Sequence, residues 1–196
     1  MAITINGTGS ITGLTAGGLP DGSITSADLA SGAITAGALP TGSILQVVQT
    51  TKTDTYTTNS ASWVTPTDLS VNITPSTTSS KILIFATVAL AGQTGYSTAM
   101  ARLRRGSNVI YAGDSGPASG MQSYGQFYTA DNGFYSIPVV GIYLDSPGVD
   151  TQITYDIQVR SQSTSGTVYV NRTQADRNAA GDSRTVSSIT VMEVAA

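Results

Sequence analysis

The spacing of apolar residues divides the chain into two parts. From residue 19 to residue 45 an apolar side chain recurs at every fifth position, and mostly small residues fill the gaps. Written in tens, the stretch reads LPDGSITSAD, LASGAITAGA and LPTGSIL, and an earlier TGSIT stands at residues 8–12. The apolar positions form two columns of this repeat, one with Leu19, Leu29 and Leu39, the other with Ile24, Ile34 and Ile44.

Two apolar side chains per ten residues cannot hold a single chain in one conformation. Ordering a residue costs roughly 1–2 kcal/mol, whereas fully burying a leucine or isoleucine side chain returns about 1.5–3 kcal/mol. Several copies side by side would let each apolar residue meet its symmetry mates. The repeat therefore predicts an oligomerising arm or stalk over residues 1–45, with a disordered Gly/Ser/Thr linker as the alternative.

From residue 46 the pattern becomes that of β-structure. Apolar or alternating stretches are separated by turn signals every 8–12 residues, which is typical of a sandwich or barrel, and no stretch has a convincing helical period. We therefore expect an all-β head over residues 46–196, an antiparallel β-sandwich of jelly-roll type. The expected strands are 44–52, 61–65, 68–74, 81–91, 97–105, 108–112, 121–129, 134–145, 151–160, 167–171 and 184–194.

Four stretches carry most of this prediction. Residues 81–88 are almost continuously apolar, which predicts a central strand buried on both faces. Residues 103–111 predict a hairpin that turns at 105–108. Residues 153–160 alternate between apolar and polar, with one face inward and one outward. Residues 188–194 alternate in the same way, so we expect the C-terminus to be held in a sheet.

Two expectations concern packing in this head. Trp63, the single tryptophan, is expected to anchor the core. Arg102 and Arg104 alternate onto one face of their strand, where we expect ion pairs with aspartates of a neighbouring chain.

Composition excludes several classes of function. Charged residues make up 11% of the chain and the net charge is −3, so there is no electrostatic signature for nucleic acid or an anionic membrane. The chain has no cysteine and no histidine, which removes disulfides, thiolate metal sites and the commonest general base. We expect no metal and no cofactor. The longest apolar run, 82–91, is far shorter than the ~20 residues that span a bilayer, and the first ten residues lack the features of a secretory signal, so no membrane insertion is expected.

Several segments resemble a known group of viral proteins. The opening MAITINGTGSITGLTAGGLPDGSIT, the decads ending in GSI and the following GSILQVVQTTKTDTYTTNSASWV are similar to the N-terminal halves of phage virion proteins. These are often labelled tail-fibre proteins in marine phages, including cyanophages, and in freshwater phages. TVYVNR at 167–172 and SSITVMEV at 187–194 resemble the last strands of the small jelly-roll heads of the same group. The resemblance spans nearly the whole chain and implies a homotrimeric, non-enzymatic part of a virion, assembled in the host cytoplasm.

The resemblance leaves the part of the virion open. One reading is a tail-fibre-type protein that docks by its arm on the tail or baseplate and presents its head to the host surface. The alternative is a capsid decoration (cement) protein whose arm and trimeric head stabilise the shell of major capsid protein, and a neck or baseplate component is a third reading. In each case we expect virion attachment through Ile3, Ile5, Ile11 and Leu14, and oligomer contacts at the six residues of the two columns.

A host cell-surface glycan is the ligand expected for a fibre head. Aromatic faces and planar polar side chains in long loops on a β-scaffold suit such a ligand. Packing in the core or the trimer interface is the alternative for each tyrosine. The candidate contacts are Tyr96, Tyr124, Tyr128, Asn171, Arg172 and Arg177.

An enzymatic reading finds little support in the sequence. Residues 113–117, GDSGP, resemble the surroundings of a serine-protease nucleophile, but that chemistry needs a histidine and the chain has none. A glycosidase needs two carboxylates about 5–10 Å apart. Asp145 and Asp150 could form such a pair, although they flank the turn signal Ser146-Pro147-Gly148 and are better explained as solvated turn residues. We therefore expect no enzymatic activity.

Overall fold

A computed structural model describes residues 24–95, 98–114, 122–128 and 133–196. The chain divides into two units, Met1–Leu39 and Pro40–Ala196. We describe each unit by itself and call the second unit the head. Within the described residues no helix is long and apolar enough to cross a membrane.

The described part of the first unit, residues 24–39, consists of turns and one short 3-10 helix, η1 (Ala36–Ala38). One turn is closed by Thr25, whose backbone N–H and hydroxyl donate to the Asp28 carboxylate at 2.8 and 2.7 Å. These hydrogen bonds lower the pKa of Asp28. The described apolar side chains of the repeat, those of Ile24, Leu29, Ile34 and Leu39, are exposed in the single chain. Their role as oligomer contacts stays a prediction.

The described part of the head is built from strands. Those of the first sheet are β1 (Ile44–Lys52), β2 (Tyr56–Thr58), β4 (Lys81–Gly92), β8 (Ile137–Asp145), β10 (Val168–Val170) and β11 (Ser187–Val194). Those of the second sheet are β3 (Ser70–Ile73), β5 (Thr98–Arg105), β6 (Asn108–Ile110), β7 (Gly125–Tyr128) and β9 (Ile153–Ser161).

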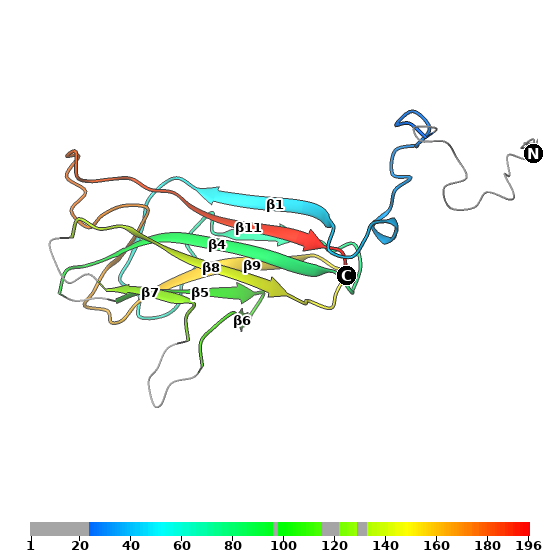
Figure 1. The fold of residues 1–196 in the computed structure, drawn as a ribbon. Helices are drawn as coiled ribbons and strands as arrows, with labels where there is room; N and C mark the ends of the chain where they lie inside the picture. The colour runs from blue at the N-terminus through cyan, green and yellow to red at the C-terminus, as the bar shows by residue number, and fades with distance from the viewer. Residues whose placement is uncertain (1–23, 96–97, 115–121, 129–132) are drawn as a thin grey trace, which may run out of the picture. The chain divides into compact units, whose positions relative to one another are not determined.

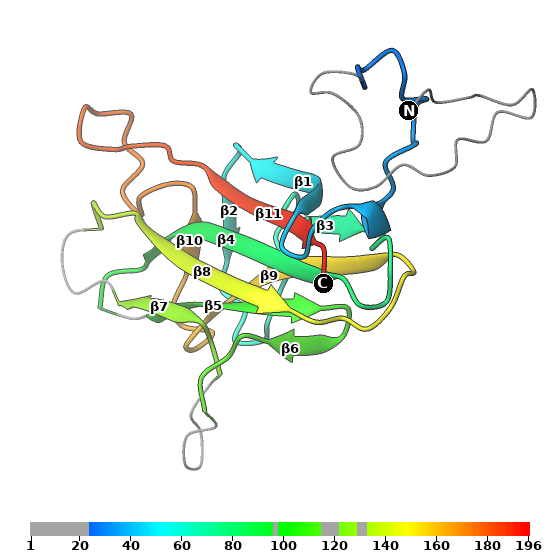
Figure 2. The ribbon, with the colours of Figure 1, turned by 45° about the vertical axis from the view of Figure 1, so that its right-hand side comes forward.

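The strand order is that of a jelly roll. In the first sheet β1, β11, β4 and β8 lie side by side. The short β10 pairs with the last residues of β4, beyond the part that pairs with β11, and β2 pairs with β10. In the second sheet the order is β3, β9, β5, with β7 and β6 both along the free side of β5. All pairs are antiparallel, and the two sheets lie face to face (Figures 1 and 2). Most connections between successive long strands cross from one sheet to the other, which is the double Greek key of a jelly roll. The expected antiparallel β-sandwich is confirmed.

The core forms because each sheet turns one apolar face inward. Along β4 alternate residues from Ile82 to Leu90 are fully buried, and along β9 the same holds for Tyr155, Ile157 and Val159. The two-residue period of a strand places these side chains on one face. The outer face of the first sheet is partly exposed, whereas on the second sheet the outward residues Asp156, Gln158 and Arg160 of β9 are themselves buried. The two outer faces differ sharply in chemistry, as described below.

Strand register defines two ends of the head. Ile44 pairs with Val194 and Lys52 pairs with Ser187, so the start of β1 and the C-terminus share one end. There the N–H of Gly42 donates to the carbonyl of Ala195 at 2.8 Å, which fixes the chain where it enters the head. We call this the stem end. The described loops 53–55, 133–136 and 171–186 lie at the opposite end, which we call the loop end (Figure 1).

Several sequence predictions are confirmed and three are corrected. The 103–111 hairpin and the C-terminal strand form as expected. Residues 61–65 do not form a strand, since only Val64 makes an isolated bridge, to Val159. The short strand β2 was not predicted. Trp63 is only half-buried and lies outside the core cluster, because it stands beside Arg102 and Arg160 and not between the sheets.

The third correction concerns the outer face of β4. This strand is central, between β11 and β8, as expected. The prediction that it is buried on both faces is wrong for a single head. Its inward residues are fully buried, whereas Leu83 and Phe85 on the outer face remain partly exposed.

Candidate functional site

The second sheet has a polar outer face on which an ion pair and a further side-chain hydrogen bond join β5 to β9 within the chain. Arg104 donates to both carboxylate oxygens of Asp156, at 3.1 and 2.9 Å, and Arg102 donates to Gln158 at 2.8 Å. The Trp63 ring lies 4.5 Å from the Arg102 guanidinium carbon. The expected pairing of Arg102 and Arg104 with aspartates of a neighbouring chain is therefore corrected: Arg104 pairs with an aspartate of its own chain because β9 is the neighbour of β5.

Asp145, one of the two carboxylates considered for hydrolysis, has a structural role. It is buried at the end of β8 and accepts two hydrogen bonds from Arg105, at 3.0 and 2.8 Å, and one from the Tyr155 hydroxyl at 2.7 Å. Burial and the bond to this carboxylate raise the pKa of Tyr155. These contacts join the two sheets near the stem end. Asp150 is exposed in the loop that follows.

A second buried carboxylate, that of Glu193, lies where β1 and β11 meet the loop before β4. It accepts hydrogen bonds from Gln46 Nε2 at 2.6 Å, from the backbone and hydroxyl of Ser76 at 2.6 and 3.1 Å, and from the Ser80 hydroxyl at 2.6 Å. Burial opposes its charge, but the bonds from Ser80, Gln46 and Ser76 outweigh burial and lower the pKa of Glu193. The cluster fastens the stem end around the first and last strands.

Asn171 organises the opposite end from inside. It is fully buried with a φ of 61°, a left-handed conformation that asparagine tolerates better than most residues. Its amide nitrogen donates to the carbonyls of Lys52 and Asp54 at 2.8 and 3.0 Å, and its amide oxygen accepts from the Ser187 hydroxyl at 2.5 Å. Asn171 therefore links β1, β10 and β11, and its side chain is not offered at the surface.

Paired arginines cover the loop that follows Asn171. Asp176 accepts from Arg172 at 2.8 Å and from two nitrogens of Arg184 at 2.8 and 3.0 Å. Arg172 also lies over the ring of Tyr169, 4.6 Å from its centroid. These contacts hold the loop in one conformation while Arg184 keeps 60% of its side chain exposed.

The same end carries aromatic surface. Arg177 pairs with Asp182 at 3.2 Å and lies over the Phe134 ring, 4.3 Å from its centroid. The Arg177 contacts lower the pKa of Asp182. Tyr128 and Tyr135 are more than half exposed. The loop end thus presents aromatic rings beside guanidinium groups, the chemistry that suits a sugar surface.

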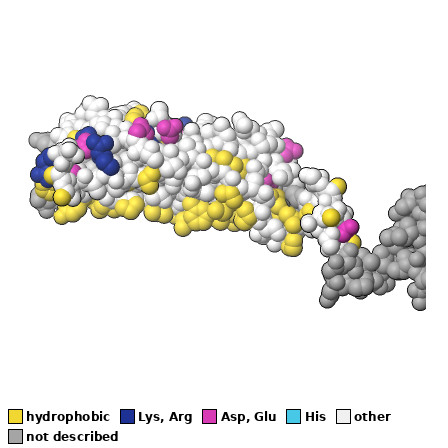
Figure 3. Space-filling model, turned by 90° about the horizontal axis from the view of Figure 1, so that it is seen from above, with side chains coloured by type: hydrophobic (Ala, Val, Ile, Leu, Met, Phe, Trp, Pro, Cys, Tyr) yellow, Lys and Arg dark blue, Asp and Glu magenta, His cyan; other side chains and the backbone are white. Residues whose placement is uncertain are grey.

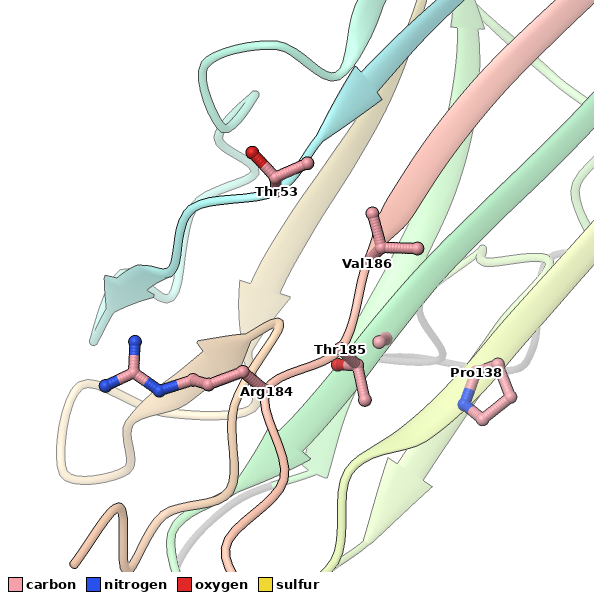
Figure 4. Close-up of a pocket in the computed structure, with 6 residues that line it drawn as sticks. Thr53, Pro138, Arg184, Thr185 and Val186 are labelled. Atoms are coloured by element: carbon pink, nitrogen blue, oxygen red, sulfur yellow. The ribbon is translucent and has the colours of Figure 1, made fainter. Parts of the chain in front are cut away.

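A shallow hollow of about 570 Å³ opens next to this end (Figure 4). Its walls are mainly apolar, from Ala89, Pro138 and Val186, and Arg184 extends from the loop that forms one side. Thr53 and Thr185 complete the lining.

The outer face of the first sheet is apolar. Residues directly opposite in antiparallel strands share a face, so the outward residues of β1, β11, β4 and β8 can be read from the register. Val47, Val140, Ile142 and Leu144 are 55%, 53%, 53% and 47% exposed. Figure 3 shows hydrophobic side chains gathered along one long side of the head. We call this surface the apolar face and define it by Val47, Leu83, Phe85, Val140, Ile142 and Leu144.

The candidate ligand contacts fall into three groups. Tyr128 and Arg177 are exposed at the surface, and Arg172 is half-buried in its ion pair. Tyr124 packs against Tyr111 with ring centroids 6.2 Å apart, its side chain partly covers the core, and burial raises its pKa. Asn171 is inside the head, as described above.

Some predicted contacts lie outside the described residues. These are Tyr96, Leu19 and the attachment residues Ile3, Ile5, Ile11 and Leu14. Ile44, assigned to the arm by its column, is the first residue of β1 and half-exposed. Of the GDSGP string, residues 115–117 also lie outside the described part. In the rest of the chain, no group of three or more carboxylates is placed to hold a metal ion.

Sequence reasoning missed the apolar face. Its signal was present, since residues 137–144, IPVVGIYL, carry apolar side chains at both odd and even positions. A strand with one solvent-facing side normally alternates apolar with polar residues. The continuous run therefore indicated a strand with two apolar faces, of which only one belongs to the core.

Comparisons with known proteins give neighbours of low similarity. No protein-family model matches the chain, and no curated protein matches it. Among solved structures, it is similar to a structure of infectious bursal disease virus, Gx strain (15% identity, TM-score 0.37), to one of the Gt strain (14%, 0.34) and to the VP2 subviral particle of that virus (14%, 0.34). Each match covers 76% of this chain but only 40%, 36% and 37% of the other. Similarity at this level assigns neither a family nor a function to the chain.

Proposed function

We propose that the chain is a non-enzymatic structural protein of a phage virion, a homotrimer of the tail-fibre type. Its N-terminal arm docks on other virion proteins, and its jelly-roll head binds a glycan of the host surface. The sequence resemblance of residues 1–64 and of the last strands supports the virion role. The observation that carries the binding role is the loop end, which gathers exposed aromatic rings and arginines at the end of the head remote from residues 40–43.

The chemistry of that end favours a neutral or acidic sugar. Tyr128 offers a flat apolar ring for stacking, and Arg177 offers guanidinium hydrogens beyond those used by Asp182. The surrounding loop is already ordered by its own ion pairs, so binding needs little further loss of conformational entropy. Such pre-organisation suits a receptor-binding surface.

Immunogold electron microscopy of purified virions, with antibody against residues 46–196, tests the virion role. Gold confined to the tail or its tip would support the fibre. Absence of gold from every part of the virion would refute the virion role altogether.

A glycan array with the full chain tests the binding role. We expect binding that is lost in Tyr128→Ala and Arg177→Ala and kept in Asp150→Asn, because Asp150 lies in a loop near the stem end. Equal binding by all three variants, or none by the native chain, would argue against the loop end as a glycan site.

A capsid decoration protein is the second candidate. The repeat runs for only three decads before the head, which suits a short arm on a shell, and the wide apolar face suits a protein that packs against other subunits. Gold spread over the capsid in the same experiment would support this candidate and remove the reason to search for a glycan.

The arm is tested separately through its apolar columns. Ile24→Asp combined with Ile34→Asp should leave a soluble, β-rich head that fails to join virions, because both side chains are exposed in a single chain and available for contact. Circular dichroism checks the fold, and virion incorporation is the readout. Normal incorporation of the double variant would refute the role of the repeat.

A further inference from the structure

Exposed apolar side chains gather on the outer face of four adjacent strands of the first sheet. Nine residues of β4 pair with β8, and four strands lie side by side across the face. At about 3.3 Å per residue and about 4.8 Å per strand, the whole outer face, polar as well as apolar side chains included, measures roughly 30 by 19 Å, on the order of 600 Å². The largest apolar patch on a monomeric protein typically measures about 300–600 Å² and is often functional, and a stable interface buries about 800 Å² on each partner. An outer face of this size, with its polar residues included, is large enough for most of one side of an interface.

The chemistry of the face points to its partner. Among the outward residues of these four strands, Lys81 at the end of β4 carries the single charge. The remainder are uncharged. They comprise apolar side chains, including Met192 beside Leu83, and the polar residues Gln49, Thr51, Thr87, Ser188 and Thr190. Nucleic acid or a strongly charged protein surface would find no complementary charge here. An equally uncharged, apolar surface is required, and the same face on another copy of this chain is one.

The sequence supports the same conclusion independently. The runs ILIFA at 82–86 and IPVVGIYL at 137–144 are apolar at successive positions, the pattern of strands that are covered on both sides. One side of β4 is covered by the core, while Leu83 and Phe85 on the other side remain partly exposed. On β8, Ile142 lies outside the hydrophobic core, and 53% of the residue is exposed.

We infer that the apolar face is the surface through which heads of this chain pack against other copies of the chain. The inference deepens the proposed homo-oligomer, on which it rests, and names the contact surface. It does not depend on the place of the protein in a virion. The polar face of the second sheet and the loop end then remain free on the outside of the assembly.

Light scattering coupled to size exclusion, with the full chain over a wide range of concentrations, tests this inference. The native chain should give a whole multiple of the chain mass. Ile142→Lys should weaken association about tenfold or more, because an unpaired ammonium would be buried in the contact. Tyr128→Lys is the matched control: Tyr128 is similarly exposed, at 55%, but belongs to the second sheet, and its variant should keep the native mass.

Cysteine labelling makes the test independent of contacts by the arm. The chain has no cysteine, so Ile142→Cys and Tyr128→Cys each carry one thiol. In the multimer, position 142 should react slowly with a bulky maleimide and position 128 fast, and dilution to monomers should remove the difference. Circular dichroism confirms that each variant is folded.

The outcomes separate the inference from the proposed trimer. A dimer with position 142 protected supports the apolar face and refutes the trimer, whereas a trimer with position 142 protected supports both. A native chain that is monomeric at every concentration overturns the inference. A multimer in which positions 142 and 128 react equally fast also overturns the inference, since the copies are then joined through another surface. Slow reaction of position 142 in a monomer overturns it as well, because another part of the same chain would then cover the face.

Discussion

Replacing Glu193 by glutamine tests how much one buried carboxylate contributes to the head. The change keeps the shape of the side chain and removes its charge. The carboxylate accepts four hydrogen bonds, two on each oxygen, from Gln46, Ser76 and Ser80. Glutamine has one acceptor oxygen, so its NH2 group would face two of these donors.

The structure sets the size of the loss. Suppose that the new NH2 group takes the place of the oxygen that is bonded to Gln46 and to the Ser76 hydroxyl. The Ser76 hydroxyl can rotate and accept a hydrogen bond from this NH2 group. The Gln46 amide cannot turn its oxygen toward it without losing its own 2.7 Å hydrogen bond to the carbonyl of Thr74. At least one bond is therefore lost and the others become neutral. Hydrogen bonds to charged groups contribute about 1.5–3 kcal/mol and neutral ones about 1 kcal/mol, so the free energy of unfolding should fall by about 2–4 kcal/mol. For a domain of this size that corresponds to a Tm lower by roughly 5–15 °C.

The pH dependence gives the prediction a second readout. The pKa of Glu193 lies below its ordinary value of 4.5 in the folded head. A lowered folded-state pKa means that the stabilisation is fully present above pH 4.5 and is lost as the pH falls through the folded-state pKa. The difference in stability between the native chain and Glu193→Gln should therefore be constant near neutral pH and shrink below about pH 4.5.

Urea unfolding provides the measurement. Far-UV circular dichroism reports on the whole head, and the fluorescence of Trp63 reports on the second sheet. All samples are compared at one protein concentration, because association would add to apparent stability. Asp150→Asn, in an exposed loop, is the control for charge removal and should leave stability within about 0.5 kcal/mol. If Glu193→Gln is as stable as the native chain at neutral pH, or if the difference persists unchanged in acid, the reasoning is wrong.

Three further substitutions are expected to differ in their effect on the free energy of unfolding, each measured by the same method. Gly125→Ala should cost about 1–3 kcal/mol, because a Cβ at that position would overlap Cγ1 of Val139. Asn171→Ala should cost about 2–4 kcal/mol, because it removes the donor to the buried carbonyl of Lys52 and to that of Asp54, removes the acceptor of the Ser187 hydroxyl, and places an alanine at positive φ. Arg184→Ala should cost less than about 1 kcal/mol, because its ion pair with Asp176 is largely solvent-exposed.

Matched changes check these three expectations. Gly113→Ala should be nearly neutral, since the nearest atom to its added Cβ would be 3.9 Å away. Asn171→Gly keeps the backbone conformation and should recover part, but not all, of the loss in Asn171→Ala. A loss for Arg184→Ala as large as that for Asn171→Ala would contradict the expectation that the buried hydrogen bonds of Asn171 contribute more to stability than the exposed Arg184 side chain.

Periodicity alone was enough to predict the class of fold and most strands of this protein. A strand places alternate residues on opposite faces whatever its surroundings, so the alternation at 153–160 and 188–194 predicted β9 and β11 and which of their residues face the core. Local turn chemistry likewise predicted the hairpin at 105–108. The short β2 has no such signal, because three residues beside β10 are held by pairing and not by a pattern of their own.

Tertiary structure decided what each residue does. The sequence marked Asn171 and Arg177 as similar polar loop residues, yet chain crossings bury Asn171 between three strands and leave Arg177 exposed. The sequence likewise did not determine the ion-pair partner of Arg104, which depends on the position of β9 beside β5. The sequence determined that residues 81–88 and 137–144 carry apolar side chains on both sides of their strands, because this depends only on the order of residues along the chain. Only the packing of the two sheets decided which side is core and which side is left for a partner, because burial depends on contacts between strands far apart in the chain.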